Sequence, residues 1–205
     1  MADSVAPEFV RFIATQRPEA LALQARAEGQ VGKSFLLNAD EAARLLPVAA
    51  RRAAGFFRPT KRTEVVWVEG ESELAVSLDG LKLQFGTGIL VMTLLVRCDQ
   101  TGAAEVHVHF ACGEPQRPAG LYAAAQRRPQ GPELIVTTWG DALVAFAWQC
   151  VLGLVSGLAN ATGKDQRGNL LVPVEMVATP RGLEIVPMAR HRFSGSTGLK
   201  TPVKR

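Results

Sequence analysis

The chain has 205 residues, of which 47% are hydrophobic and 20% are charged. This composition excludes a disordered or fibrous protein, and the length predicts one domain with a sizeable core. The formal net charge of +4 is only mildly basic, so charge alone identifies no partner.

The first 60 residues are expected to be helical. Asn38 and Glu41 have the spacing of a capping box, which predicts a helix beginning after Asn38. Pro47 is expected to break or kink this helix, and Gly55 to end it. The chain does not open with a basic segment followed by an apolar core, so the expected location is cytoplasmic.

Residues 62–112 carry the strand signals. Polar and apolar residues alternate on both sides of Asp79-Gly80, and such a pair is typical of a two-residue hairpin turn. This turn would pair Leu78 with Leu81 and set the apolar side chains of both strands on one face. Residues 89–96 are almost all apolar, which predicts a central strand covered on both faces.

A long connection, residues 113–132, leads to the most apolar part of the chain. Residues 134–137 are predicted to be a strand, and Thr138 and Asp141 have the spacing of a second capping box. The helix that follows is nearly all apolar over 142–159. A stripe of small or polar residues on it is expected to lie close on the sheet: Ala142, Ala145, Gln149, Gly153, Ser156 and Asn160.

The same apolar helix could span a bilayer by length. A spanning helix would leave the edges of the neighbouring strands unpaired in lipid, so a buried core helix is favoured. The last elements are a hairpin around residues 179–182, with Pro173 and Pro187 at an edge or near a bulge.

Together these elements predict an α+β domain. Its antiparallel sheet of about six to eight strands packs on one long apolar helix, with N-terminal helices. The expected organisation is an N-terminal helical segment at 1–60, a sheet-plus-helix core at 61–193 and a flexible basic tail at 194–205.

The most prominent charged feature is a basic segment between Glu41 and Glu64, which contains no acidic residue. It could contact phosphates or an acidic partner, with Phe56 and Phe57 available for stacking on bases. A solvated helix face is the simpler interpretation. The basic residues are Arg44, Arg51, Arg52, Arg58, Lys61 and Arg62.

A metal site is the second candidate. Glu105, His107 and His109 alternate along one predicted strand, so their side chains share a face and could converge on one ion. The polar side of a half-buried strand has the same pattern, and no further ligand stands nearby in the sequence.

Catalytic motifs are poorly represented. Gly32-Lys33-Ser34 lacks the earlier glycine of a phosphate-binding loop. Three widely spaced cysteines, Cys98, Cys112 and Cys150, form no disulfide pattern and are expected to be buried apolar groups in a reducing compartment.

The leading hypothesis is therefore a non-enzymatic binding or protein-interaction domain, with an acidic protein or a small apolar ligand as its partner. One alternative is a nucleic-acid-binding protein that uses residues 44–62. Another is a metal-dependent enzyme with its site at Glu105, His107 and His109. The sequence identifies no cofactor and does not set the oligomeric state.

Overall fold

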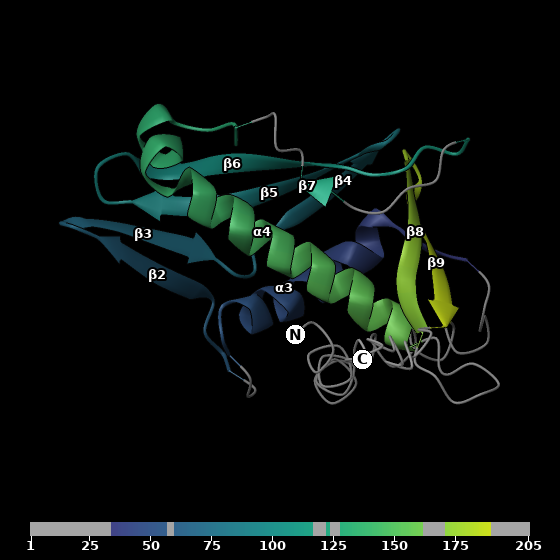
Figure 1. The fold of residues 1–205 in the computed structure, drawn as a ribbon. Coiled ribbons are helices and arrows are strands. Elements are labelled where there is room, and N and C mark those ends of the chain that lie inside the picture. Colours follow the sequence, from purple (N-terminus) through teal and green to yellow (C-terminus); the bar gives the residue numbers. More distant parts are fainter. Residues whose placement is uncertain (1–33, 57–59, 117–121, 124–127, 162–170, 190–205) are drawn as a thin grey trace, which may run out of the picture.

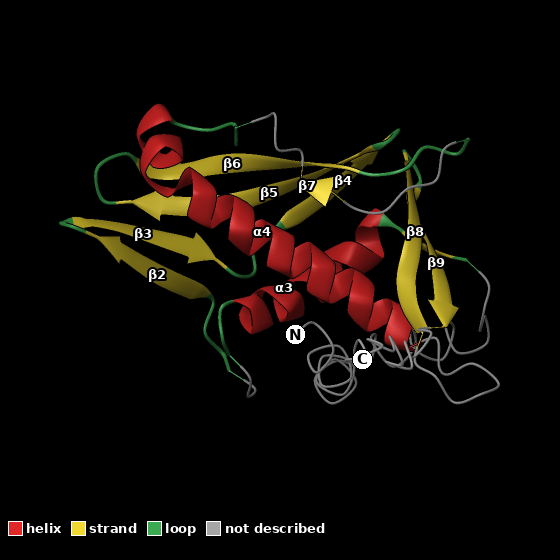
Figure 2. Ribbon diagram, viewed as in Figure 1, coloured by secondary structure: helices red, strands yellow, loops and turns green. Residues whose placement is uncertain are grey.

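The computed structural model describes residues 34–56, 60–116, 122–123, 128–161 and 171–189. They form an α+β fold in which two antiparallel sheets share one core with a long apolar helix, so the predicted fold class is confirmed (Figures 1 and 2). The predicted helices before residue 34 and the basic tail lie outside the described residues. Within the segment expected to be helical, residues 35–37 form a strand instead, and residues 35–50 belong to the same core as the rest.

The strands divide between a sheet of six and a sheet of three, where the sequence predicts one sheet. The larger sheet contains β2 (Glu64–Glu69), β3 (Ser72–Ser77), β4 (Lys82–Gly86), β5 (Ile89–Cys98), β6 (Gly102–Ala111) and β7 (Tyr122–Ala123). The smaller sheet has the order β1 (Phe35–Leu37), β9 (Gly182–Ala189), β8 (Leu171–Thr179). The helices are α3 (Ala39–Ala53) and α4 (Glu133–Ala161).

Helix α3 begins where its capping box predicts. Asn38 Oδ1 accepts a hydrogen bond from the Glu41 N–H at 2.9 Å, and a Glu41 carboxylate oxygen accepts one from the Asn38 N–H at 3.3 Å. Gly55, with a φ of +84°, follows its last turn, as expected. Of the break or kink predicted at Pro47, the break is wrong, because the helix continues through Pro47 and buries apolar residues on both sides. The carbonyl that loses its partner belongs to Ala43, which is exposed to water.

The predicted hairpin at Asp79-Gly80 is also wrong. Strands β3 and β4 run in the same direction along one edge of β5, with Val76 opposite Val96 and Leu83 opposite Met92. Among the described residues only glycines other than Gly80 have a positive φ, so the turn geometry that an Asp-Gly hairpin needs is absent.

Local contacts explain why the chain continues instead of reversing. The Asp79 carboxylate is paired with Arg51 of α3 at 2.7 Å, and the Gly80 N–H donates to Ser77 Oγ at 3.0 Å. The ten-residue strand β5 is long enough to pair with both β3 and β4. The apolar side chains still share the buried face, as the alternation predicts: Leu74, Val76, Leu78, Leu81 and Leu83.

Helix α4 starts at Glu133, so the predicted strand at 134–137 and the capping box at Thr138 are wrong. The Pro132 carbonyl accepts the first helical hydrogen bond, from the Val136 N–H at 3.0 Å. Buried residues recur every three or four positions from the start of the helix, which is the period of a helix and not of a strand. They include Ile135, Trp139, Leu143, Phe146, Cys150 and Leu154.

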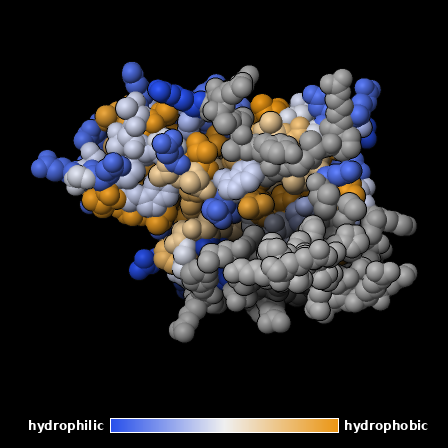
Figure 3. Space-filling view, in the orientation of Figure 1, coloured by the Kyte–Doolittle hydropathy of each residue, from blue (hydrophilic) through white to orange (hydrophobic). Residues whose placement is uncertain are grey.

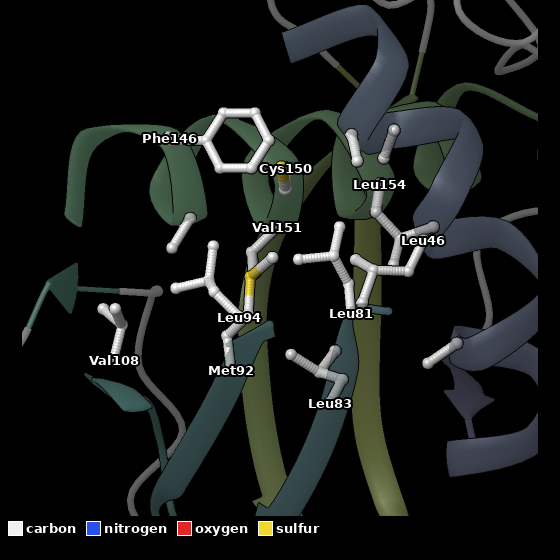
Figure 4. Packing of buried hydrophobic residues seen from close by; sticks show 14 of the residues in the cluster. Leu46, Leu81, Leu83, Met92, Leu94, Val108, Phe146, Cys150, Val151 and Leu154 are labelled. Carbon is white, nitrogen blue, oxygen red and sulfur yellow. The ribbon is translucent and has the colours of Figure 1, made fainter. Parts of the chain in front are cut away.

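The helix also presents the opposite face to the one predicted. Ala142, Ala145 and Gln149 of the small stripe are exposed, and a Cβ on Gly153 would touch nothing within 4 Å. Figure 4 shows Val151 and Leu154 of α4 pointing towards strand residues such as Leu94, while Leu46 of α3 lies beside them. Large apolar groups remove more area from water than alanine or glycine, so they decide which face is buried.

The two sheets are joined directly by backbone hydrogen bonds along β8. Gly88 N–H donates to the Ala178 carbonyl at 3.1 Å, and Gly113 exchanges bonds of 2.9 Å with Met176 and Ala178. The β8–β9 hairpin forms as predicted, and its register shifts between Pro173 and Glu175, where a bulge was expected.

Most of α4 lies inside the fold. Among the described helices, α4 contains one segment, Glu133–Ala159, that is long and apolar enough to cross a membrane, and 56% of its most apolar stretch is buried. It contacts α3 and strands of both sheets, which is how the core helix of a folded domain packs.

Replacing Gly153 or Gly182 by alanine should change the stability of the fold in opposite directions. Gly153→Ala should raise the free energy of unfolding by about 0.5–1 kcal/mol, since α4 has room for a methyl group there and alanine favours the helix. Gly182→Ala should lower it by at least about 2 kcal/mol, because Gly182 has a φ of +143° and a Cβ would collide with the Leu37 carbonyl. Urea denaturation measures both, and equal effects would contradict the packing described for α4.

Candidate functional site

The structure separates the residues of the basic segment into two groups. Arg44, Lys61 and Arg62 are exposed, whereas Arg51 and Arg52 are half-buried at the end of α3. Arg58 and Phe57 lie outside the described residues. The segment is thus not one continuous basic surface.

Arg51 holds three parts of the fold together. Its Nη2 pairs with Asp79 at 2.7 Å, its Nε donates to the Arg62 carbonyl at 3.1 Å, and its Nη1 donates to the Pro47 carbonyl at 3.2 Å. Only 12% of the Arg51 side chain is exposed. A guanidinium with these acceptors is committed to the structure and is poorly placed to bind phosphate.

Phe56 is also largely committed to the fold. Its ring is half-buried against the core, and the Arg62 guanidinium lies 5.3 Å from the ring centroid. A base that stacked on Phe56 would have to displace Arg62. The predicted nucleic-acid surface therefore reduces, among the described residues, to Arg44, Lys61 and Arg62, and it stays a prediction.

The candidate metal residues lie on the face of the larger sheet opposite α4. Strand pairing sets Lys82, Thr93 and His107 in one row across β4, β5 and β6. His107 Nδ1 is 2.9 Å from the buried Thr93 Oγ1, and Glu105 pairs with Lys82 Nζ at 3.3 Å. His107 thus has a partner on the neighbouring strand β5, and Glu105 has one on β4, two strands away.

This row has the chemistry of a sheet surface. In the described part of the chain no group of three or more His, Cys, Asp or Glu residues is placed to hold a metal ion. The His107 backbone also exchanges hydrogen bonds of 2.8 and 2.9 Å with Gln130, which covers the edge of β6. The metal hypothesis gains no support from this geometry and remains a prediction.

The cysteines that burial affects most are poor nucleophiles. Desolvation raises the pKa of Cys112 to about 11; a hydrogen bond with the Ala178 backbone lowers this pKa, but it is the weaker effect. Burial also raises the pKa of Cys150. A reactive cysteine needs a lowered pKa, so neither the buried Cys150 nor the half-buried Cys112 has the character of a nucleophile.

The sequence analysis missed one feature, the outer edge of β2. This strand ends the larger sheet, and no strand of the described residues pairs with its far side (Figure 1). Val66 is 53% exposed and Val68 is 64% exposed, although both are large apolar residues. Figure 3 shows apolar surface in this region, at the lower left, bordered by hydrophilic residues.

The opposite side of β2 is firmly anchored. Six consecutive residue pairs join it to β3. Trp67 meets Phe146 edge-on at 5.6 Å and Trp139 at 6.4 Å between ring centroids, which ties the strand to α4. The exposed edge is therefore a rigid element and not a loose segment.

Comparison with protein families, with curated proteins and with solved structures finds no match to this chain. The functional interpretation depends on its own geometry.

The structural role of Arg51 can be tested against an exposed neighbour. Arg51→Ala should lower the free energy of unfolding by roughly 1–3 kcal/mol, because Asp79 and two carbonyls lose a charged donor. Lys61→Ala should change it by less than about 0.5 kcal/mol. Chemical denaturation of both variants measures the difference, and equal stability would mean that the Arg51 contacts contribute nothing.

The raised pKa of Cys112 predicts a loss of stability at alkaline pH. Below pH 9.0, the ordinary pKa of cysteine, the thiol is protonated in both the folded and the unfolded protein. Between pH 9 and about pH 11 the unfolded chain loses this proton and the folded protein keeps it. Stability should therefore fall more steeply over this interval in the wild-type protein than in Cys112→Ala. Parallel curves of unfolding free energy against pH would contradict the burial of this thiol.

Proposed function

We propose that this chain is a non-enzymatic protein-interaction domain whose docking element is the exposed edge of β2. The observation that carries the proposal is a fixed strand whose outer edge pairs with no other strand of the described residues, with two exposed valines on its face away from α4. An extended segment of a partner can add to such an edge as one more strand. Main-chain hydrogen bonds then supply affinity, and side chains that flank the edge supply specificity.

The exposure of Val66 and Val68 supports this proposal. Proteins usually protect an edge strand with charges, prolines or a covering segment, because a bare apolar edge pairs with other chains. Here the two residues that bracket the strand, Glu64 and Glu69, are charged, but the centre of the strand is valine and tryptophan. An apolar edge of this kind fits a surface that is covered when the protein works.

The rigidity of β2 supports the proposal as well. A disordered segment would lose conformational entropy on binding, whereas β2 is already held by β3 and by the aromatic contacts of Trp67. The strand can thus accept a partner with little reorganisation.

Site-specific photo-crosslinking tests this function. A photoreactive amino acid at position 68 should give a defined protein adduct in the cells from which the chain comes. The same amino acid at position 36 is the matched control, since Leu36 is 39% exposed on the smaller sheet. The proposal fails if position 68 gives no protein adduct, or gives only what position 36 gives.

A further inference from the structure

We infer that the partner of the β2 edge is the β2 edge of a second copy of this chain, paired antiparallel to form a continuous sheet through a two-fold axis. This inference rests on the proposed function and names the occupant of the same edge. Three features of β2 carry it: the direction of its backbone groups, the polarity of its charges and the register that symmetry allows.

The backbone of β2 offers donors and acceptors at alternate residues. Leu78 N–H donates to the Thr63 carbonyl at 2.7 Å, so the odd-numbered residues of this strand direct their backbone groups to β3. In an antiparallel ladder the intervening residues point the other way. The N–H and C=O groups of Glu64, Val66 and Val68 therefore point to the open edge.

The charges along β2 favour pairing with a reversed copy of itself. Lys61 and Arg62 precede β2, which starts with Glu64, whereas Glu69 ends the strand and Glu71 follows in the turn to β3; all five residues are exposed. Antiparallel pairing sets the basic start of one strand beside the acidic end of the other, twice in each dimer. Parallel pairing would set like charges together, which is unfavourable across neighbouring strands. The acidic partner expected from the basic segment is thus supplied by the chain itself.

Symmetry limits the register. A two-fold axis perpendicular to the sheet pairs residues of the same face, which places a residue opposite its own copy at the axis. With Val66 at the axis, Val65 lies opposite Trp67 of the second copy, and Glu69 lies opposite Thr63 of the second copy, two residues from its Lys61. A shift of one residue in the pairing would set Glu64 opposite Glu69 of the second copy. Residues opposite each other would then point their side chains to different faces of the sheet.

Sedimentation velocity of the full chain over a range of concentrations tests the dimer. The wild-type protein should dimerise, and Val66→Pro should weaken dimerisation about tenfold or more, since proline removes the outward N–H of each copy at the axis. The β2–β3 ladder should survive, because the Val66 N–H does not point to β3. Val66→Thr, which keeps the N–H and the branched shape, is the matched control and should still dimerise.

Exchange of charges tests the direction and register without altering the backbone. Lys61→Glu and Glu69→Lys should each weaken the dimer, by roughly threefold to tenfold for two symmetric exposed pairs. The double variant should recover wild-type dimerisation. Lys61 lies before the start of β2 and Glu69 at its far end, so the two residues cannot compensate each other within one copy.

A wild-type chain that sediments as a monomer at every concentration would overturn the inference. A dimer that is unaffected by Val66→Pro, or a double charge variant that stays as weak as the single ones, would overturn it too. If Val66→Pro does not fold, the charge exchange decides. A crosslink from position 68 to a different protein, with a monomeric chain, would leave the proposed function intact and reject only the second copy as partner.

Discussion

The structure depends on the burial of the large apolar face of α4. One side of this helix contacts the larger sheet, α3 and the smaller sheet, so three separate parts of the chain bury their apolar residues against it. Each fully buried leucine or phenylalanine contributes roughly 1.5–3 kcal/mol, which offsets the entropy of ordering the strands. The exposed stripe of small residues is a consequence of this packing, because the large side chains occupy the inner face.

Sequence patterns predicted the elements well where the deciding contacts are local. The capping box of Asn38 and Glu41 and the last hairpin need only residues a few positions apart, and both form as expected. The turn at Asp79-Gly80 has an equally strong local signal, yet Arg51, 28 positions earlier, pairs with the aspartate. The long strand β5 then keeps β3 and β4 on one edge. No local pattern records such a contact.

The candidate site depends even more on contacts between distant residues, which local sequence patterns do not record. Alternation along β6 correctly places His107 and its neighbours on one face, but it does not reveal that Thr93 of β5 and Lys82 of β4 lie in the same row as His107. Counting basic residues likewise does not separate Arg51, which is held by three acceptors, from Lys61, which is exposed. The edge of β2 could not be recognised at all, because strand order depends on pairings between distant segments. The one available signal is that valines occupy both faces of a strand of which only one face is covered.

An exposed strand edge raises the question of why pairing would stop at two copies. A sheet with two equivalent open edges can grow without limit, whereas a two-fold contact through a single edge closes on itself. The far side of the larger sheet is formed by the two-residue strand β7 and by Gln130 bonded to His107. The smaller sheet ends on one side in β8, which is bonded to Gly88 and Gly113, and on the other side in the three-residue strand β1. In the described residues these alternatives are short or already paired, so the edge of β2 is the natural place for a strand to add, and its pairing would close after one partner.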